Sequence, residues 1–284
     1  MTATEPRRDP VFDADEARRA RNRRIEGVAR WALPLLVVLL TVWGWNWFSN
    51  STQTPGLIFP EPARVWARLL ADHQMLFALI LVTLKITFLA LGIAIVGGVL
   101  LAILFMQSRF AELVFFPYAV VLPVTPIVSI APLIFIYAQD RLAGVLICAW
   151  IVAFFPILPN TTSGLKSTDR NREDLYTIYG ATGCQRLLYL QFPATLPCCL
   201  GGLRIAGGLA LIGAILAEYM AGIGRSGSGL AFRFLEASYR LNYPRMFSAL
   251  ILIAVVGVLI FAATSCLTWF LLRKWHENAL SRSP

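Results

Sequence analysis

Long apolar stretches constrain the fold of this chain more than any other feature of its sequence. A helix needs about 20 apolar residues to cross the roughly 30 Å hydrocarbon core of a bilayer. Six stretches reach or approach that length, at residues 31–48, 80–105, 111–137, 142–162, 200–221 and 247–272. They lack the alternation that a membrane β-barrel requires, whereas a spanning helix satisfies all of its backbone hydrogen bonds internally. The sequence therefore predicts an all-α, polytopic membrane protein with about six transmembrane helices.

Composition and charge argue against several other classes of protein. Hydrophobic residues fill 57% of the 284 positions and charged residues 14%, whereas soluble domains carry about 25% charged residues. The net charge of +9 comes from basic residues near the ends of apolar stretches, which predicts contact with membrane lipid and no nucleic-acid binding. The two histidines, His73 and His276, are far apart, and the five cysteines form no CxxC pair. We therefore expect no catalytic residues, no metal site and no cofactor in this chain.

The placement of lysine and arginine predicts the orientation of the chain. Residues 1–30 are basic and lack the pattern of a cleaved signal peptide, so we interpret them as a cytoplasmic tail, with partner binding as the alternative. The inner face then receives Arg109, Lys166, Arg170, Arg172, Arg186, Arg204, Arg273 and Lys274. The outer face receives Arg64, Arg68, Arg141, Arg225, Arg233, Arg240 and Arg245. The last four form a cluster that departs from the positive-inside rule, but both termini inside remains the better fit.

This orientation implies a division of the chain into segments. They are the tail at residues 1–30, a first transmembrane helix at 31–48, a periplasmic segment at 49–75, a core transmembrane domain at 76–272 with a cytoplasmic loop at 164–197, and a C-terminal cytoplasmic tail at 273–284. Within the periplasmic segment, residues 60–72 are predicted to form a short interfacial helix.

The cytoplasmic loop at residues 164–197 carries the most specific pattern. Leu175, Ile178 and Tyr179 fall at helical spacing, which gives a short helix one apolar face with no membrane to cover it. Such a face indicates a docking surface. Gly180 is predicted to end this helix in a left-handed turn, and Pro193 is predicted to stop the following segment before the next membrane helix.

This loop resembles the EAA loop of bacterial ABC importer permeases. The family pattern is E-A-A, three residues, G, nine residues, then I-x-L-P. Here Asp174-Leu175-Tyr176 stands in the E-A-A place, Gly180 has the required offset, and Leu190-Gln191-Phe192-Pro193 follows at the required distance. The spacing is intact, while both alanines are replaced and Leu and Phe stand for Ile and Leu.

Other segments extend the resemblance. Phe154-Phe155-Pro156, Asn160-Thr161, Gly164-Leu165, Gly202-Leu203-Arg204-Ile205-Ala206 and Ala217-Glu218 are similar to the subgroup that transports nitrate, sulfonates, taurine and pyrimidine precursors. The resemblance implies a type I, MetI-like fold in the bacterial inner membrane and a homodimer of permeases. It also implies two ATPase subunits inside and a solute-binding protein in the periplasm. Because this chain contains no G-x-x-x-x-G-K-[ST] motif, ATP and Mg²⁺ are expected on the ATPase partner.

The resemblance also assigns the residues that would dock on the ATPase. They are Asp174, Leu175, Tyr176, Ile178, Tyr179, Gly180, Ala181, Leu190 and Pro193.

Three residues are candidates for the translocation path: Glu218, Pro126 and Asn160. Glu218 ends a stripe of small residues at i+4 spacing, and its alternative role is an ion pair with Lys85 or an outer arginine. Pro126 is one of the prolines of the third apolar stretch, which predict a kinked helix. The segment at 222–227 matches G-x-G-x-x-G, but a membrane helix precedes it, so we interpret it as an outer loop rather than a dinucleotide site.

The sequence leaves the solute open, and it leaves two alternative functions open. Sulfonate-like or taurine-like solutes, pyrimidine-like solutes and small anions all fit the resemblance, and a small organic solute is favoured because no strongly basic buried path is visible. The alternative functions are an ion-coupled carrier and a membrane-integral enzyme or assembly factor, each without an ATPase partner.

Overall fold

The computed structural model describes residues 32–51, 59–221 and 228–280, and these residues form helices joined by short connections. The G-x-G-x-x-G segment, the N-terminal tail and the last four residues lie outside this description. Among these described residues, five helices are long and apolar enough to cross a membrane. They are Ala32–Ser51, α3 (His73–Gln107), α6 (Arg141–Lys166), the continuous helix Gly183–Met220 and Tyr243–Arg273, which is the apolar part of α11 (Tyr243–Leu280). The prediction of an all-α polytopic membrane protein is confirmed.

The third predicted stretch forms two helices instead of one kinked helix. α4 (Arg109–Val124) ends at Thr125, and α5 (Ile127–Ala138) begins after Pro126. Thr125 has φ −71° and ψ 125°, and Pro126 has ψ 114°, so both residues are extended. Proline disfavours helical backbone in the residue before it and has no N–H to donate. The predicted kink was therefore wrong, because the backbone leaves the helix completely at this point.

The chain divides into two compact units, residues 1–65 and 66–284. In the first unit, the end of the helix Ala32–Ser51 holds the segment that follows it. The indole Nε1 of Trp45 donates to the carbonyl of Pro60 at 3.1 Å. The ring of Phe59 packs edge-on against Phe48, with centroids 5.2 Å apart. A short helix, α2 (Pro62–Ala71), then leads into the second unit, close to the helix predicted at residues 60–72.

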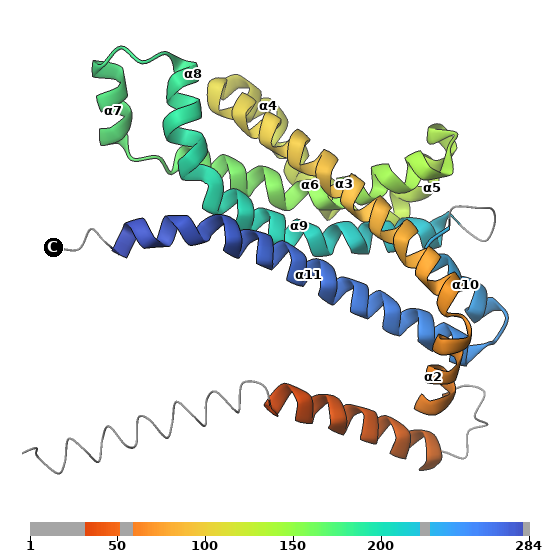
Figure 1. Cartoon of the computed structure of the whole chain (residues 1–284). Coiled ribbons are helices and arrows are strands. Elements are labelled where there is room, and N and C mark those ends of the chain that lie inside the picture. Colours follow the sequence, from red (N-terminus) through yellow and green to blue (C-terminus); the bar gives the residue numbers. More distant parts are fainter. Residues whose placement is uncertain (1–31, 52–58, 222–227, 281–284) are drawn as a thin grey trace, which may run out of the picture. The chain divides into compact units, whose positions relative to one another are not determined.

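The second unit is built around the packing of α6 against α9 (Phe192–Met220) and α3. Figure 1 shows these helices running between two ends, with α7 and α8 at one and α10 at the other. The stripe of small residues on α9 lies in this core: Gly202, Ala206, Ala210 and Ala214 are all buried. A Cβ at Gly202 would lie 2.7 Å from the carbonyl oxygen of Pro156 on α6. The stripe therefore serves close helix packing.

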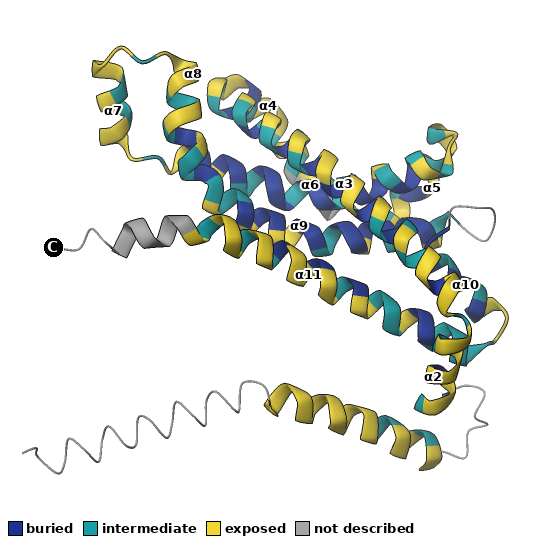
Figure 2. Ribbon diagram, viewed as in Figure 1, coloured by how far each residue is buried: buried dark blue, intermediate teal, exposed yellow. Residues whose placement is uncertain are grey.

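Figure 2 shows that buried residues gather on the inner faces of α3, α6 and α9, while exposed residues line the outer faces of α3 and α11. The exposed side chains there are apolar, such as Phe88 and Ile93 on α3 and Val258 on α11. A soluble protein does not leave such continuous apolar faces open. We interpret these faces as the surface in contact with lipid.

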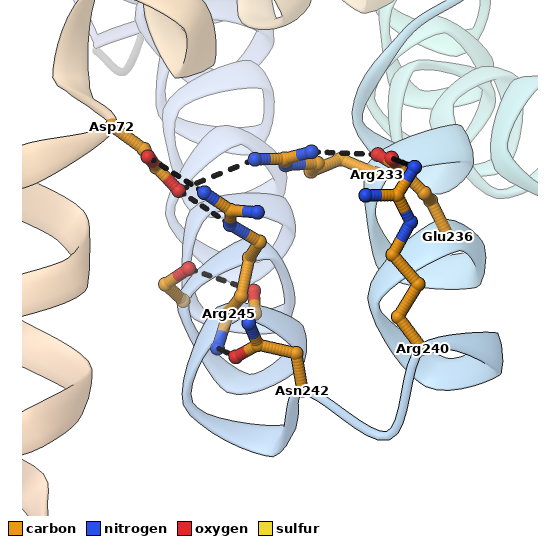
Figure 3. Close-up of polar contacts among 7 residues, drawn as sticks. Asp72, Arg233, Glu236, Arg240, Asn242 and Arg245 are labelled. Carbon is orange, nitrogen blue, oxygen red and sulfur yellow. Dashed lines mark hydrogen bonds and ion pairs between the residues drawn. The ribbon is translucent and has the colours of Figure 1, made fainter.

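An ion-pair network holds α10 (Leu230–Tyr239) to the starts of α3 and α11 (Figure 3). Asp72 accepts from Arg245 through both carboxylate oxygens, at 2.7 and 3.0 Å, and from Arg233 at 3.3 Å. Arg233 also donates to Glu236 at 2.6 Å, and Arg240 pairs with Glu236 at 3.0 Å. The hydrogen bonds from Arg245, together with the charges of both arginines, hold the pKa of Asp72 below its ordinary value.

This network accounts for most of the arginine cluster that departs from the positive-inside rule. Its members Arg233, Arg240 and Arg245 are all paired with local carboxylates. These ion pairs give the three arginines a structural role at this end of the bundle, where they hold α10 to α3 and α11.

Candidate functional site

The first arm of the cytoplasmic loop is α7 (Arg170–Ile178), which local sequence specifies at both ends. At its start, the carboxylate of Asp169 accepts from the backbone N–H of Asn171 at 3.1 Å. At its end, Gly180 has φ +68°, and the N–H of Ala181 donates back to the carbonyl of Tyr176 at 2.9 Å. This backbone pattern needs a left-handed residue, for which glycine has no steric cost. The predicted left-handed turn at Gly180 is confirmed.

The apolar face of α7 is open in the described chain. Ile178 and Tyr179 are each 81% exposed and Leu175 is 51% exposed, although the helix is not in an apolar stretch. A groove of about 500 Å³ runs beside this face, and Asp174 is exposed next to it. It is lined by Leu175, Tyr176, Tyr179, Gly180, Ala181, Gln185 and Tyr189. Five of the nine residues predicted to dock on the ATPase therefore meet at one concave apolar surface.

The second arm is continuous with the membrane helix α9. Thr182 begins α8 (Gly183–Arg186) through a capping box, in which its hydroxyl accepts from the N–H of Gln185 and the Gln185 side chain accepts from the N–H of Thr182. The helix continues through the π-helical turn η1 (Leu187–Gln191), which contains Leu190, into α9.

Pro193 does not stop the helix, and that prediction was wrong. In α-helical geometry its missing N–H would leave one carbonyl unpaired, and its ring would crowd the preceding turn. The structure widens that turn instead: the N–H of Phe192 donates to the carbonyl of Leu187, five residues earlier. π-Helical turns of this kind let a helix absorb a local disruption without ending.

A partly buried hydrogen bond joins the two arms. Gln191 is 3% exposed, and its Nε2 donates to the Oε1 of Glu173 on α7 at 2.9 Å. Close by, Lys166 at the end of α6 pairs with Glu112 on α4. Because Gln191 directly precedes α9, this hydrogen bond connects α7 to the start of that membrane helix. The sequence did not point to Glu173 or Gln191, since residues so far apart leave no local periodic signal.

Glu218, a candidate path residue, is enclosed at the far end of α9. Its side chain is 1% exposed, and one carboxylate oxygen accepts from the N–H of Ala231 in the first turn of α10, at 3.2 Å. The hydroxyl of Thr83 accepts from the neighbouring Leu230 N–H at 2.9 Å. A carboxylate at a helix N-terminus is stabilised by the unpaired N–H groups and the helix dipole. No ion pair joins Glu218 to Lys85 among the described residues.

The other two path candidates lie elsewhere. The side-chain Nδ2 of Asn160 donates to the carbonyl of Pro156 at 2.6 Å, next to Gly202 on α9. Glu218 follows Gly202 by 16 positions, which is about 24 Å along a helix. Pro126 is exposed at the break between α4 and α5. The structure does not bring the three residues into one site, and their place on a path stays a prediction.

A bundle of long apolar helices with an exposed apolar hairpin continuous with a core helix is the architecture of a membrane transport subunit. The comparison with known proteins agrees. Residues 94–276 match the family of the binding-protein-dependent transport system inner membrane component, and this chain belongs to that family. It is an importer permease of the ABC class, as the EAA-like loop predicted.

The chain aligns with curated permeases over nearly their full length. The chain is 30% identical over 246 residues to the formylaminopyrimidine transport permease ThiX of Halalkalibacterium halodurans, covering 86% of this chain and 96% of the relative. It is 28% identical over 250 residues to the riboflavin transport system permease RibX of Chloroflexus aurantiacus, covering 87% and 90%. It is 25% identical over 275 residues to the putative aliphatic sulfonates transport permease SsuC of Bacillus subtilis, covering 95% of each.

Solved structures share the fold. The inward-facing MetNI methionine ABC transporter matches with a TM-score of 0.59 at 16% identity, covering 70% of this chain and 96% of that chain. An amino acid ABC transporter crystallised with histidines matches with a TM-score of 0.58 at 19% identity, covering 72% and 96%. The MetI-like, type I architecture is therefore confirmed.

Proposed function

We propose that this chain forms the solute path of an ABC importer and couples that path to a separate ATPase subunit through α7. The observation that carries the proposal is the open apolar face of Leu175, Ile178 and Tyr179 beside a groove of about 500 Å³. An apolar helix face outside the bilayer needs a protein partner to cover it. Because the chain belongs to a family of ABC importer permeases, the proposed partner is an ATPase subunit.

The coupling follows from how the two arms are joined. An ATPase that closes on ATP and Mg²⁺ moves whatever is seated on it, here α7. The Glu173–Gln191 hydrogen bond and the short turn at Gly180 pass that motion to η1 and then to α9. Because α9 packs along α6, its reorientation changes which side of the bundle is open. The chain itself then supplies no bond-making chemistry.

The other subunits of the transporter are proposed from the family to which this chain belongs. We propose a homodimer of this permease in the bacterial inner membrane, two ATPase subunits inside and a solute-binding protein in the periplasm. The proposal also puts both termini in the cytoplasm and the α10 end of the bundle outside. The described structure is consistent with this orientation, because α7, with its exposed basic and polar residues, and the C-terminal end of α11 lie at the same end of the second unit (Figure 1).

The solute is proposed to be small and organic. The names of the three relatives that align with most of this chain cite formylaminopyrimidine, riboflavin and aliphatic sulfonates, which are organic. A nitrate import permease of Synechocystis, NrtB, aligns over a smaller share, 59% of this chain at 28% identity. The similarity to the first three permeases spans most of each chain, which favours a sulfonate-like or pyrimidine-like solute over an inorganic anion.

The test is co-purification of the ATPase with the tagged permease from detergent extracts. The change Ile178→Asp places a charge on the open face of α7 and is expected to abolish ATPase capture. The matched control Asn171→Asp adds the same charge to the first turn of the same helix, where a carboxylate is tolerated, and is expected to retain it. Solute uptake by the wild-type chain with repeated absence of any ATPase would instead establish the ion-coupled carrier.

A further inference from the structure

A second cavity, of about 740 Å³, lies where α4, α6 and α7 meet, at the end of the bundle that carries α7 and α8 (Figure 1). Its walls come from the end of α3, the first half of α4, the end of α6 and the start of α7. Phe105 and Leu165, each 1% exposed, form part of its apolar lining. The cavity shares no residue with the groove beside the apolar face of α7, so docking on that groove leaves it unused.

The charged residues of this cavity are unequally engaged. Its two carboxylates have partners: Glu112 pairs with Lys166, and Glu173 accepts the hydrogen bond from the second arm of the loop at 2.9 Å. Arg109 on α4 and Arg170 on α7 also line the cavity, and neither forms an ion pair with any residue that the structure describes. The cavity therefore offers two guanidinium groups whose donors are available to an anion.

The apolar part of the cavity continues along α4. Arg109, Leu113 and Pro117 recur at every fourth position, which puts them on one side of the helix, and Leu113 is 70% exposed. Because α3 spans the membrane and ends at Gln107, the start of α4 lies at the membrane surface. Pro117 follows Arg109 by eight residues, about 12 Å along the helix. The stripe thus runs from a cation at the surface to apolar residues deeper in the bilayer.

We propose that this cavity binds the phosphate of an anionic phospholipid, with an acyl chain lying along Leu113 and Pro117. Guanidinium groups bind phosphate oxygens in pairs, and basic pockets between membrane helices on the cytoplasmic side are typical sites for anionic headgroups. A free phosphate would use the same guanidinium groups but leave the apolar stripe uncovered, so the stripe favours lipid. The proposed orientation of the chain enters only in assigning this lipid to the inner leaflet. Since Arg109 belongs to α4 and Arg170 to α7, one headgroup joins the membrane bundle to the cytoplasmic loop.

The test is a lipid titration of the full-length permease in a neutral detergent, followed by native mass spectrometry. We expect phosphatidylglycerol to bind more tightly than phosphatidylcholine with the same acyl chains. The double variant Arg109→Gln with Arg170→Gln should lower the affinity for phosphatidylglycerol about 30-fold, because each arginine near a membrane surface contributes about fivefold. Its affinity for phosphatidylcholine should not change. No ATPase is present, so a failure of the coupling proposal leaves this result unaffected.

The matched control is the double variant Arg172→Gln with Arg273→Gln. It removes two exposed arginines at the same end of the bundle, and neither lines the cavity. We expect it to bind phosphatidylglycerol like the wild type. Equal losses in the two double variants would show general attraction of charge and overturn the proposal.

Two further measurements separate lipid from a free anion. Leu113→Ala changes one exposed side chain and leaves both arginines in place, so it also guards against misfolding of the double variant. It should weaken phosphatidylglycerol binding about fourfold, the effect of one CH₂ group withdrawn from water, and an unchanged affinity would overturn the acyl-chain assignment. Inorganic phosphate at millimolar concentration should leave the bound lipid in place. Displacement of the lipid by phosphate would identify a site for a free anion and overturn the proposal.

Discussion

Replacing Gly180 by valine should separate docking from folding. Gly180 is the one described glycine with a left-handed backbone, at φ +68°, and a Cβ there would meet no atom within 4 Å. The cost of a side chain is therefore backbone strain alone, about 1 kcal/mol for alanine and roughly 2 kcal/mol for a β-branched residue. This penalty falls on the turn between α7 and α8 and leaves the packing of α6 against α9 untouched.

The backbone strain at position 180 is expected to lower the affinity of the permease for the ATPase. A penalty of roughly 2 kcal/mol lowers the population of the docking-competent turn about 30-fold, and apparent affinity for the ATPase falls by the same factor. Alanine should give about a fivefold loss. The assay is titration of purified ATPase against permease in nanodiscs, with thermal unfolding of the permease measured in parallel. Roughly 2 kcal/mol of strain lowers the melting temperature of a chain of this size by about 4–8 °C at most, so the permease is expected to remain folded.

Gly183 provides the matched control. It lies in the same loop, a Cβ there would also meet no atom within 4 Å, and it sits in α8 without a positive φ. Gly183→Ala should therefore bind the ATPase like the wild type, because the helix accepts alanine better than glycine. Unimpaired ATPase binding by Gly180→Val would show that the turn does not set the docking geometry. Equal losses in both variants would show that bulk, and not backbone conformation, is what the partner rejects.

Two further changes test the α10 end of the bundle. Gly229→Ala would drive a methyl group into the carboxylate of Glu218, so thermal unfolding should reveal a loss of about 1–3 kcal/mol, typical of overpacking; an unchanged melting temperature would contradict the enclosed geometry. Asp72→Asn should cost about 2 kcal/mol at pH 7, the worth of hydrogen bonds to charged groups. Because folding lowers the pKa of Asp72 from 3.8, its contribution is full above that pH and is lost as pH falls through the lower folded-state value. The stability difference between wild type and variant should therefore shrink on acidification, and a constant difference would refute the pairing.

Local sequence determined the features that depend on neighbours along the chain. Apolar stretches of bilayer length had to form helices, since no other open structure satisfies its backbone in lipid. The spacing from Asp174 to Gly180 defined α7 and its end, because the left-handed turn needs glycine whatever surrounds it. The exposed apolar face of α7 was equally readable, because the spacing of its residues lies within one short helix.

The prolines show where local sequence was insufficient. Pro126 was expected to bend a helix and instead ends one, while Pro193 was expected to end a helix and instead lies within one. A proline fixes its own φ and removes one backbone N–H donor. It does not determine which other group donates to the carbonyl that this N–H would have bonded. At Pro193 a π-helical turn accommodates the missing donor, and at Pro126 the backbone remains extended.

The two charged residues of α9, Arg204 and Glu218, show most clearly what the sequence alone could not determine. The sequence alone established that Arg204 and Glu218 lie on one long apolar helix, and it predicted Glu218 on the path and Arg204 at the inner surface. The tertiary structure enclosed Glu218 beneath the first turn of α10 and left Arg204 on an open face beside α11. A helix that is apolar on nearly every side carries no periodic signal of which side its neighbours cover. That choice is made by segments that pack against α9 only after the chain has folded.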